Sequence, residues 1–223
     1  MTSSSTPQRF ALAGLLTLAV IPSLAGVFRL TELVGGADIT PENTRFFASP
    51  APVVVHILAA VPFGVLGAFQ FVPAIRRRHP GRHRAAGRFL VVCGLAAALS
   101  GLWMTLLYPR TDSDGDLLTG IRLVFGLAMA ASLVLAFAAV RRRDLARHRA
   151  WMFRGYAIGM GAGTQTLLFI PSIVALGLPG ELDKALVHGL GWVINLAVAE
   201  WAIHRRPSAA AHKPEDVDRI TTE

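Results

Sequence analysis

Six long apolar stretches leave little room for any fold other than a bundle of membrane-spanning helices. A hydrocarbon core about 30 Å thick requires roughly 20 apolar residues in each helix that crosses it. The runs are continuous and show no period-two alternation, which favours helices over the strands of a β-barrel. We therefore predict an all-α, polytopic membrane protein with six transmembrane helices. The expected spans are Phe10–Phe28, Pro52–Ile75, Phe89–Tyr108, Leu117–Val140, Trp151–Leu176 and Leu186–Ile203.

The composition agrees with this class, because 53% of the residues are hydrophobic and 16% charged, against about 25% charged in soluble domains. Cys93 is the single cysteine, which excludes a disulfide-stapled scaffold and CxxC sites. Ser23-Leu24-Ala25 resembles a signal-cleavage site, but the apolar run is long for a signal, so we expect a retained first span. Residues 1–206 are expected to form one transmembrane domain and residues 207–223 a disordered cytoplasmic tail.

Basic residues gather in alternate connections of the predicted bundle. Residues 76–88 and 141–154 each contain six arginines, whereas the opposite connections are rich in acids. The positive-inside rule then places both basic loops and both termini in the cytoplasm. The net charge of +8 is explained by these loops, whose expected partners are anionic lipid headgroups of the bilayer. A nucleic-acid role is not indicated.

An internal repeat lies in the two basic loops. Residues 76–85 align without gaps on residues 141–150, with seven of ten positions identical. Each copy joins a descending helix to a returning one, which predicts a duplicated helical hairpin (helices 2-3 and 4-5) forming a four-helix core. In the fifth span Gly155, Gly159 and Gly163 share one face, which is typical of close helix packing.

Ionisable residues inside predicted spans are costly and are therefore candidates for function. Arg29, His56, Arg122 and His188 come from four different helices and lie at a similar depth near the outer face. One interpretation is that they merely reach the headgroups by snorkelling. The other is an outward-facing polar pocket for a cofactor, a quinol headgroup or a small anion.

Two pairs of histidines also fit the axial ligation of b-type haem. His56 with His188 would form an outer pair, and His83 with His148 an inner pair at matching places in the repeat. Two such pairs would carry electrons across the bilayer. Surface or structural roles are the alternative, because arginines surround both inner histidines.

Motifs of soluble enzymes are absent from the sequence. No Gly-rich phosphate loop, GxSxG elbow, HExxH or paired-carboxylate motif occurs, so hydrolase or kinase chemistry of the soluble type has no support. Glu200, near the cytoplasmic end of the sixth span, is expected to neutralise an arginine of one of the two Arg-Arg-Arg runs, and a role in a proton path is the alternative.

Four segments together resemble the bacterial integral membrane proteins of domain-of-unknown-function family 2306. The resemblance implies a multi-span protein of the bacterial inner membrane and no established reaction. Members of that family often carry an arginine in the stretch that matches Gly163–Thr166, and this chain has none there. The segments are His56 with Gly67-Ala68-Phe69-Gln70-Phe71, then His83–Arg88, His148–Ala157 and Asn195–Trp201.

Three interpretations of function therefore stay open beside a purely structural or assembly role. The leading one is an integral membrane protein with a polar His/Arg site near its outer face. The second is a b-type haem electron carrier or quinol-linked reductase. The third is a protein that binds or transports a small anion.

Overall fold

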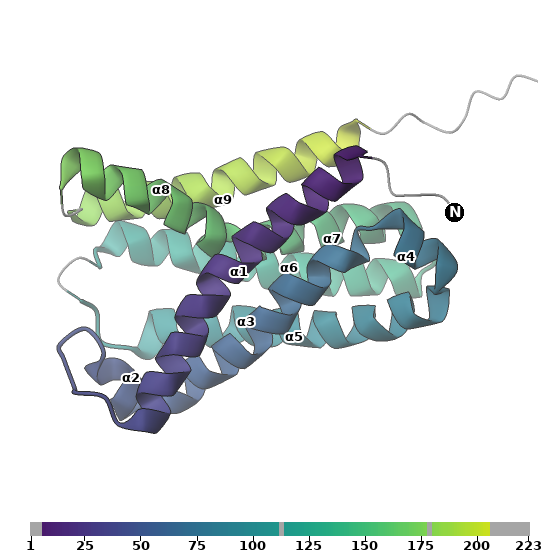
Figure 1. Cartoon of the computed structure of the whole chain (residues 1–223). Helices are drawn as coiled ribbons and strands as arrows, with labels where there is room; N and C mark the ends of the chain where they lie inside the picture. The colour runs from purple at the N-terminus through teal and green to yellow at the C-terminus, as the bar shows by residue number, and fades with distance from the viewer. Residues whose placement is uncertain (1–5, 112–113, 178–179, 206–223) are drawn as a thin grey trace, which may run out of the picture.

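The computed structural model describes residues 6–111, 114–177 and 180–205, and every regular element within them is an α-helix (Figure 1). In these residues six helical segments are long and apolar enough to cross a membrane. This confirms the all-α class and the number of predicted spans. The long helices are α1 (Thr6–Gly35), α3 (Pro50–Gln70), α5 (Pro80–Leu107), α6 (Asp116–Arg141), α7 (Leu145–Gly159), α8 (Gly161–Leu176) and α9 (Glu181–His204).

Two short helices, α2 (Thr44–Ala48) and α4 (Pro73–Arg78), lie in the connections before α3 and α5. Proline begins α3, α4 and α5, where its missing N–H costs nothing and its fixed φ suits the first turn. α5 begins nine residues before the predicted span at Phe89, because its first turns are rich in arginine and fall outside an apolar window.

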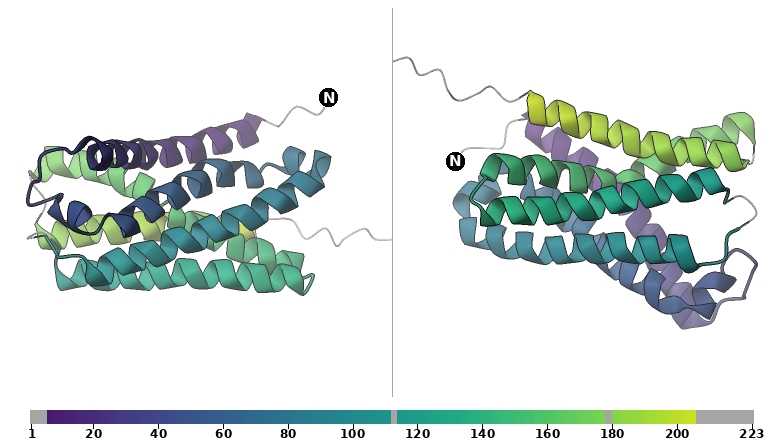
Figure 2. Two further views of the ribbon diagram at one scale, coloured as in Figure 1. Left: turned by 90° about the horizontal axis from the view of Figure 1, so that it is seen from below. Right: turned by 180° about the vertical axis from the view of Figure 1, so that it is seen from behind.

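The helices of the six spans form a closed ring. α1 packs on α3, α3 on α5, α5 on α6, α6 on α9, α9 on α8, and α8 back on α1. α1 crosses this arrangement diagonally, as Figure 1 and the two views of Figure 2 show. In the ring order, α3 and α9 therefore stand on opposite sides.

The buried core comes mainly from α3, α5, α6 and α7, the four helices of the two predicted hairpins. It includes Phe63, Leu90, Leu133 and Tyr156, and α1 adds Ala19. The phenol of Tyr156 donates a hydrogen bond of 2.7 Å to the carbonyl oxygen of Gly64 and so ties α7 to α3. The duplication itself stays a prediction.

The fifth span is broken at Met160, where the sequence predicted one continuous helix over Trp151–Leu176. The break frees backbone carbonyls that would cost several kcal/mol if left unpaired in a membrane. Side chains of α9 satisfy them: Asn195 donates to the oxygen of Ala157, and the Trp192 indole donates to that of Ile158, both at 3.1 Å.

The break changes which helices the fifth span contacts. α7 packs between α6 and α9 and reaches α3, whereas α8 packs against α9 and α1. The span thus leaves the centre of the bundle halfway along its length. Among the described residues, the half of the span beyond Met160 lies at the wall of the bundle, between α1 and α9.

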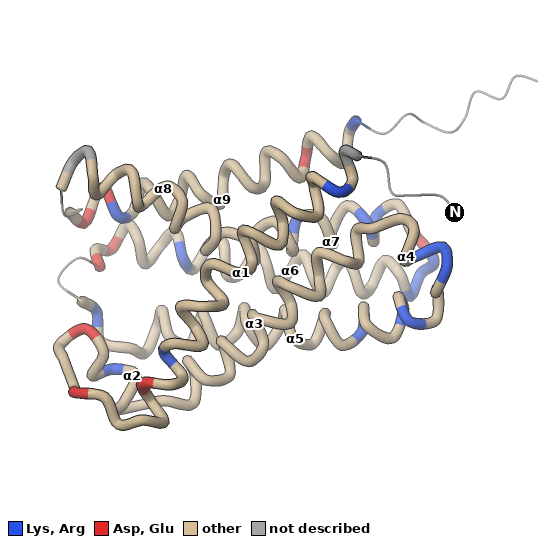
Figure 3. Tube along the Cα trace, in the orientation of Figure 1, with Lys and Arg blue, Asp and Glu red and all other residues tan. Residues whose placement is uncertain are grey.

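The two ends of the bundle differ in charge, as Figure 3 shows. We call the end with α4, the start of α5 and the α6–α7 connection the arginine-rich end. The opposite end, with α2 and the α5–α6 connection, is the acid-rich end. The expected tail, residues 207–223, lies outside the described residues.

Candidate functional site

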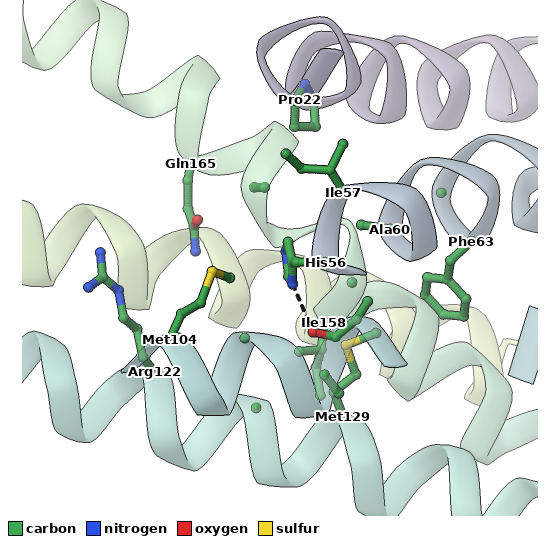
Figure 4. Close-up of a pocket in the computed structure, with 18 of the residues that line it drawn as sticks. Pro22, His56, Ile57, Ala60, Phe63, Met104, Arg122, Met129, Ile158 and Gln165 are labelled. Carbon is green, nitrogen blue, oxygen red and sulfur yellow. Dashed lines mark hydrogen bonds between the residues drawn. The ribbon is translucent and has the colours of Figure 1, made fainter. Parts of the chain in front are cut away.

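A cavity of about 430 Å³ occupies the half of the bundle toward the acid-rich end. All six spans line it, together with α2. His56, Arg122 and Gln165 enter it from α3, α6 and α8 (Figure 4). His188 and Trp192 line it from α9. Ligand sites commonly have this size and a mostly apolar wall with a few polar groups.

His56 is held by the backbone of the neighbouring helix. Its Nδ1 lies 2.9 Å from the carbonyl oxygen of Ala97 on α5 and 3.2 Å from the hydroxyl of Ser100. A carbonyl oxygen accepts, so Nδ1 carries the proton and donates it. The Nε2 atom is then an unprotonated acceptor.

His188 has the same arrangement within α9. Its Nδ1 donates to the carbonyl oxygen of Lys184 over 2.8 Å, and its ring meets Phe169 edge to face. Gln165 donates from Nε2 to the carbonyl oxygen of His188 over 3.1 Å. The Nε2 of His188 is thus a second acceptor, and the bond from Gln165 joins α8 to α9.

Asp114 gathers three cations at the acid-rich mouth of the cavity. Its carboxylate lies 2.8 Å from Lys184 Nζ, 3.3 Å from Arg45 Nη1 and 3.4 Å from Arg122 Nη1. These side chains come from α9, α2 and α6, so one acid holds three elements together. Arg45 and Arg122 also line the cavity.

The Asp114 carboxylate is almost completely buried, with 3% of its side chain exposed. Burial alone would raise its pKa, but the hydrogen bond from Lys184 and the charges of Arg122 and Lys184 hold the pKa well below its usual range. Asp114 is therefore ionised throughout the physiological pH range.

The structure brings three of the four predicted outer residues, His56, Arg122 and His188, to one cavity. Arg29 is not among the lining residues: it pairs with Glu32 at 2.7 Å and its guanidinium lies over the Phe46 ring. Phe46 itself lines the cavity, so Arg29 contacts a residue of the cavity wall without lining the cavity.

His83 and His148 lie near each other at the arginine-rich end, close enough to interact electrostatically. His148 Nδ1 is bonded to the carbonyl oxygen of Ala136 on α6 over 2.9 Å. The Nδ1 of His83 is buried and has no hydrogen-bond partner among the described residues. Neither residue lines the cavity described above.

Glu200 pairs with Arg154 of α7 and not with either Arg-Arg-Arg run. The contact is bidentate, with Nε–Oε1 at 2.5 Å and Nη2–Oε2 at 2.9 Å. Arg154 lies within α7, beyond the loop that joins α6 to α7. Its guanidinium group therefore faces α9, which carries Glu200. The expectation of neutralisation was right, and the expected partner was wrong.

Asp114, Arg45 and Lys184 were not among the sequence candidates. They belong to connections or helix ends, where charged residues are normally solvated, and they meet only after α2, α6 and α9 pack. The signal available in the sequence was the acid-rich run around Asp114, which is typical of an ordinary turn.

Six spans around one cavity define a polytopic α-helical membrane protein with a candidate ligand site. The model of the family described as predicted membrane protein (DUF2306) matches residues 53–203. The chain belongs to this family. No curated protein and no solved structure matches the chain. The matched region contains every cavity element except α1 and α2.

Proposed function

We propose that this protein binds a small lipid-soluble molecule in the cavity, through His56, His188 and Arg122. The observation that carries the proposal is the cavity itself, because the spans that surround it place these three polar side chains on one apolar space. Polar groups are costly at such a place in a membrane bundle, and a bound ligand gives them partners.

The cavity changes in polarity along its length. Its mouth holds Arg45, Tyr108 and Arg122, while the end toward the middle of the bundle is lined by Phe63, Met129 and other apolar residues. A ligand with a polar group at one end and an apolar body matches this gradient. Such a molecule partitions into the bilayer before it binds.

The proposal also includes the orientation of the bundle in the membrane and the membrane in which it lies. The arginine-rich end faces the cytoplasm of a bacterial cell, against anionic headgroups of the inner membrane, which puts the cavity near the outer face. A green fluorescent protein fused to the C-terminus should fluoresce, and an alkaline phosphatase fusion there should be inactive. The reverse pair of results would place the cavity on the cytoplasmic side.

Binding can be tested by recovering whatever molecule the cavity retains. Ala60 lines the cavity on α3, and Leu58 on the same helix is 62% exposed toward the lipid. Protein purified from native membranes is extracted with organic solvent, and the extract is analysed by mass spectrometry. A ligand of the cavity should be present in wild type and in the matched control Leu58→Phe, and depleted in Ala60→Phe. Equal extracts from all three would refute the proposal.

A specific observation favours b-type haem as a second candidate. His56 and His188 come from opposite sides of the ring, and each uses Nδ1 for a backbone carbonyl, as ligating histidines commonly do. Their Nε2 atoms would hold the haem iron, Arg45 and Arg122 would bind the haem carboxylates, and the haem would supply one-electron redox chemistry. Purified protein should then show a Soret band that sharpens with dithionite and disappears in His56→Ala. A colourless, folded protein would remove this candidate.

An anion would have to compete with an acid already present. Arg122 is bound by Asp114, so the third interpretation requires an external anion to take over part of that contact. Anion binding should then tighten in Asp114→Asn, measured as thermal stabilisation by chloride or phosphate. No stabilisation by either anion in wild type or variant would exclude it.

A further inference from the structure

We infer that the ligand is a quinol, a reduced aromatic ring with two hydroxyl groups, and that the cavity discriminates against the oxidised quinone. This inference rests on the proposed function and adds the chemical class and redox state of the ligand. It follows from which cavity atoms donate hydrogen bonds and which accept them.

The two imidazoles are acceptors toward the cavity. In His56 and in His188 the Nδ1 proton is already donated, to Ala97 and Lys184 respectively, so a neutral ring has only the lone pair of Nε2 left. The second nitrogen of His56 faces the space toward Gln165 and Arg122 in Figure 4. A ligand that satisfies these atoms must therefore supply hydrogen-bond donors.

Gln165 adds a third acceptor. Its amide nitrogen is used by the carbonyl oxygen of His188, which fixes the orientation of the amide and leaves Oε1 available on a residue that lines the cavity. The histidine and glutamine atoms that remain available to a ligand are thus all acceptors. The donors, Arg45 and Arg122, lie at the mouth of the cavity, and Asp114 occupies one nitrogen of each.

A quinol and a quinone present different chemistry to such a site. A quinol hydroxyl donates to Nε2 and can still accept from Arg122, whereas a quinone carbonyl offers lone pairs alone. Lone pairs facing lone pairs leave His56 and His188 unsatisfied, and an unpaired buried acceptor is costly. The site therefore binds the reduced form more tightly.

Placement of the histidines fits a ring with hydroxyls at opposite ends. In the order of helix contacts α3 and α9 lie on opposite sides of the bundle, so His56 and His188 line the cavity from two different walls. A flat molecule with a hydroxyl at each end would meet one histidine at each end. The apolar wall between them includes Met104, Ile57 and Trp192. The nonpolar tail of a membrane quinol would lie along the apolar part of the cavity.

The test compares decylubiquinol with decylubiquinone by equilibrium dialysis against detergent-solubilised protein in anaerobic buffer. We expect the quinol to bind about tenfold more tightly, which corresponds to roughly one hydrogen bond. In His56→Asn the amide nitrogen can still donate to Ala97 while the Nε2 acceptor is lost, so the preference should fall toward unity without loss of folding.

His204 provides a matched control for His188. It lies on the same helix and its Nδ1 also donates to the carbonyl four residues earlier, that of Glu200, but it is exposed at the other end of α9. His204→Asn should keep the full preference for the quinol, and His188→Asn should reduce it.

The results of these experiments distinguish failure of the quinol assignment from failure of the proposed ligand binding. Equal binding of both forms, tighter binding of the quinone, or no binding of either overturns the quinol assignment. A Soret band that disappears in His56→Ala also overturns it, because iron would then occupy the Nε2 atoms of His56 and His188. If the extract of the wild type still contains a molecule that Ala60→Phe excludes, the proposed binding function survives. If it does not, both fail.

Discussion

Replacing Asp114 by asparagine should weaken the acid-rich end of the bundle more than any other single charge change there. The carboxylate is 3% exposed and contacts Arg45, Arg122 and Lys184. Removing one partner of a buried ion pair typically costs about 3–5 kcal/mol. Because the three cations each keep 20–30% of their side chains exposed, water can take over part of the contact, and we expect about 3 kcal/mol.

The prediction is measured by thermal unfolding in detergent. For a chain of this size a loss of about 3 kcal/mol lowers Tm by about 6–12 °C. Asp116→Asn is the matched control, since Asp116 lies two residues away and its pair with Arg110 is mostly exposed. That surface pair is worth about 0–1 kcal/mol and is screened by salt. Similar Tm values for the two variants would refute the central role of Asp114.

Three further results are expected. The folded-state pKa of Asp114 is below its unfolded value of about 3.9, so its stabilisation should be constant above about pH 5 and be lost as the pH falls below about 4. The Tm of the wild type should therefore fall more steeply with acid than the Tm of Asp114→Asn, which keeps the Glu200–Arg154 pair. Gly163→Ala places a Cβ well inside contact distance of the backbone oxygen of Leu18, so α8 and α1 must separate by about 1 Å to restore a normal contact. We expect this separation to lower the free energy of unfolding by about 1–3 kcal/mol. The control Gly14→Ala, whose Cβ would have nothing within 4 Å, should leave Tm unchanged. Tyr156→Phe removes the buried bond to α3 and should cost about 1 kcal/mol in the same unfolding assay, and a Tm within error of wild type would show that this bond adds nothing.

The bilayer explains why the six spans could be predicted from the sequence. Each crossing needs a long apolar run, and that requirement is visible in composition alone. The depth of His56 and His188 also follows from their position along a helix of fixed rise. Their meeting in one cavity depends on packing between helices, which the sequence does not specify.

Two features of the site depended on contacts that no local pattern encodes. The break at Met160 lies inside an apolar run without proline at that point, so hydropathy predicts one helix. Asp114 lies in an acid-rich turn that resembles any solvated connection. Residues distant in the sequence stabilise both features. Asn195 and Trp192 bond the carbonyls freed at the break, and Lys184 pairs with the buried carboxylate of Asp114.

The broken fifth span accounts for the cavity. If α7 continued straight past Met160, its side chains would enter the space that His56 and His188 now line. Instead α8 packs against α1 and α9, and the carbonyls freed by the break are bonded by Asn195 and Trp192 of α9. Those bonds stabilise the inner end of the cavity, and the ion pairs of Asp114 stabilise its mouth. Both sets of contacts form within the chain itself. A preformed site loses little conformational freedom on binding, so more of each ligand contact contributes to affinity.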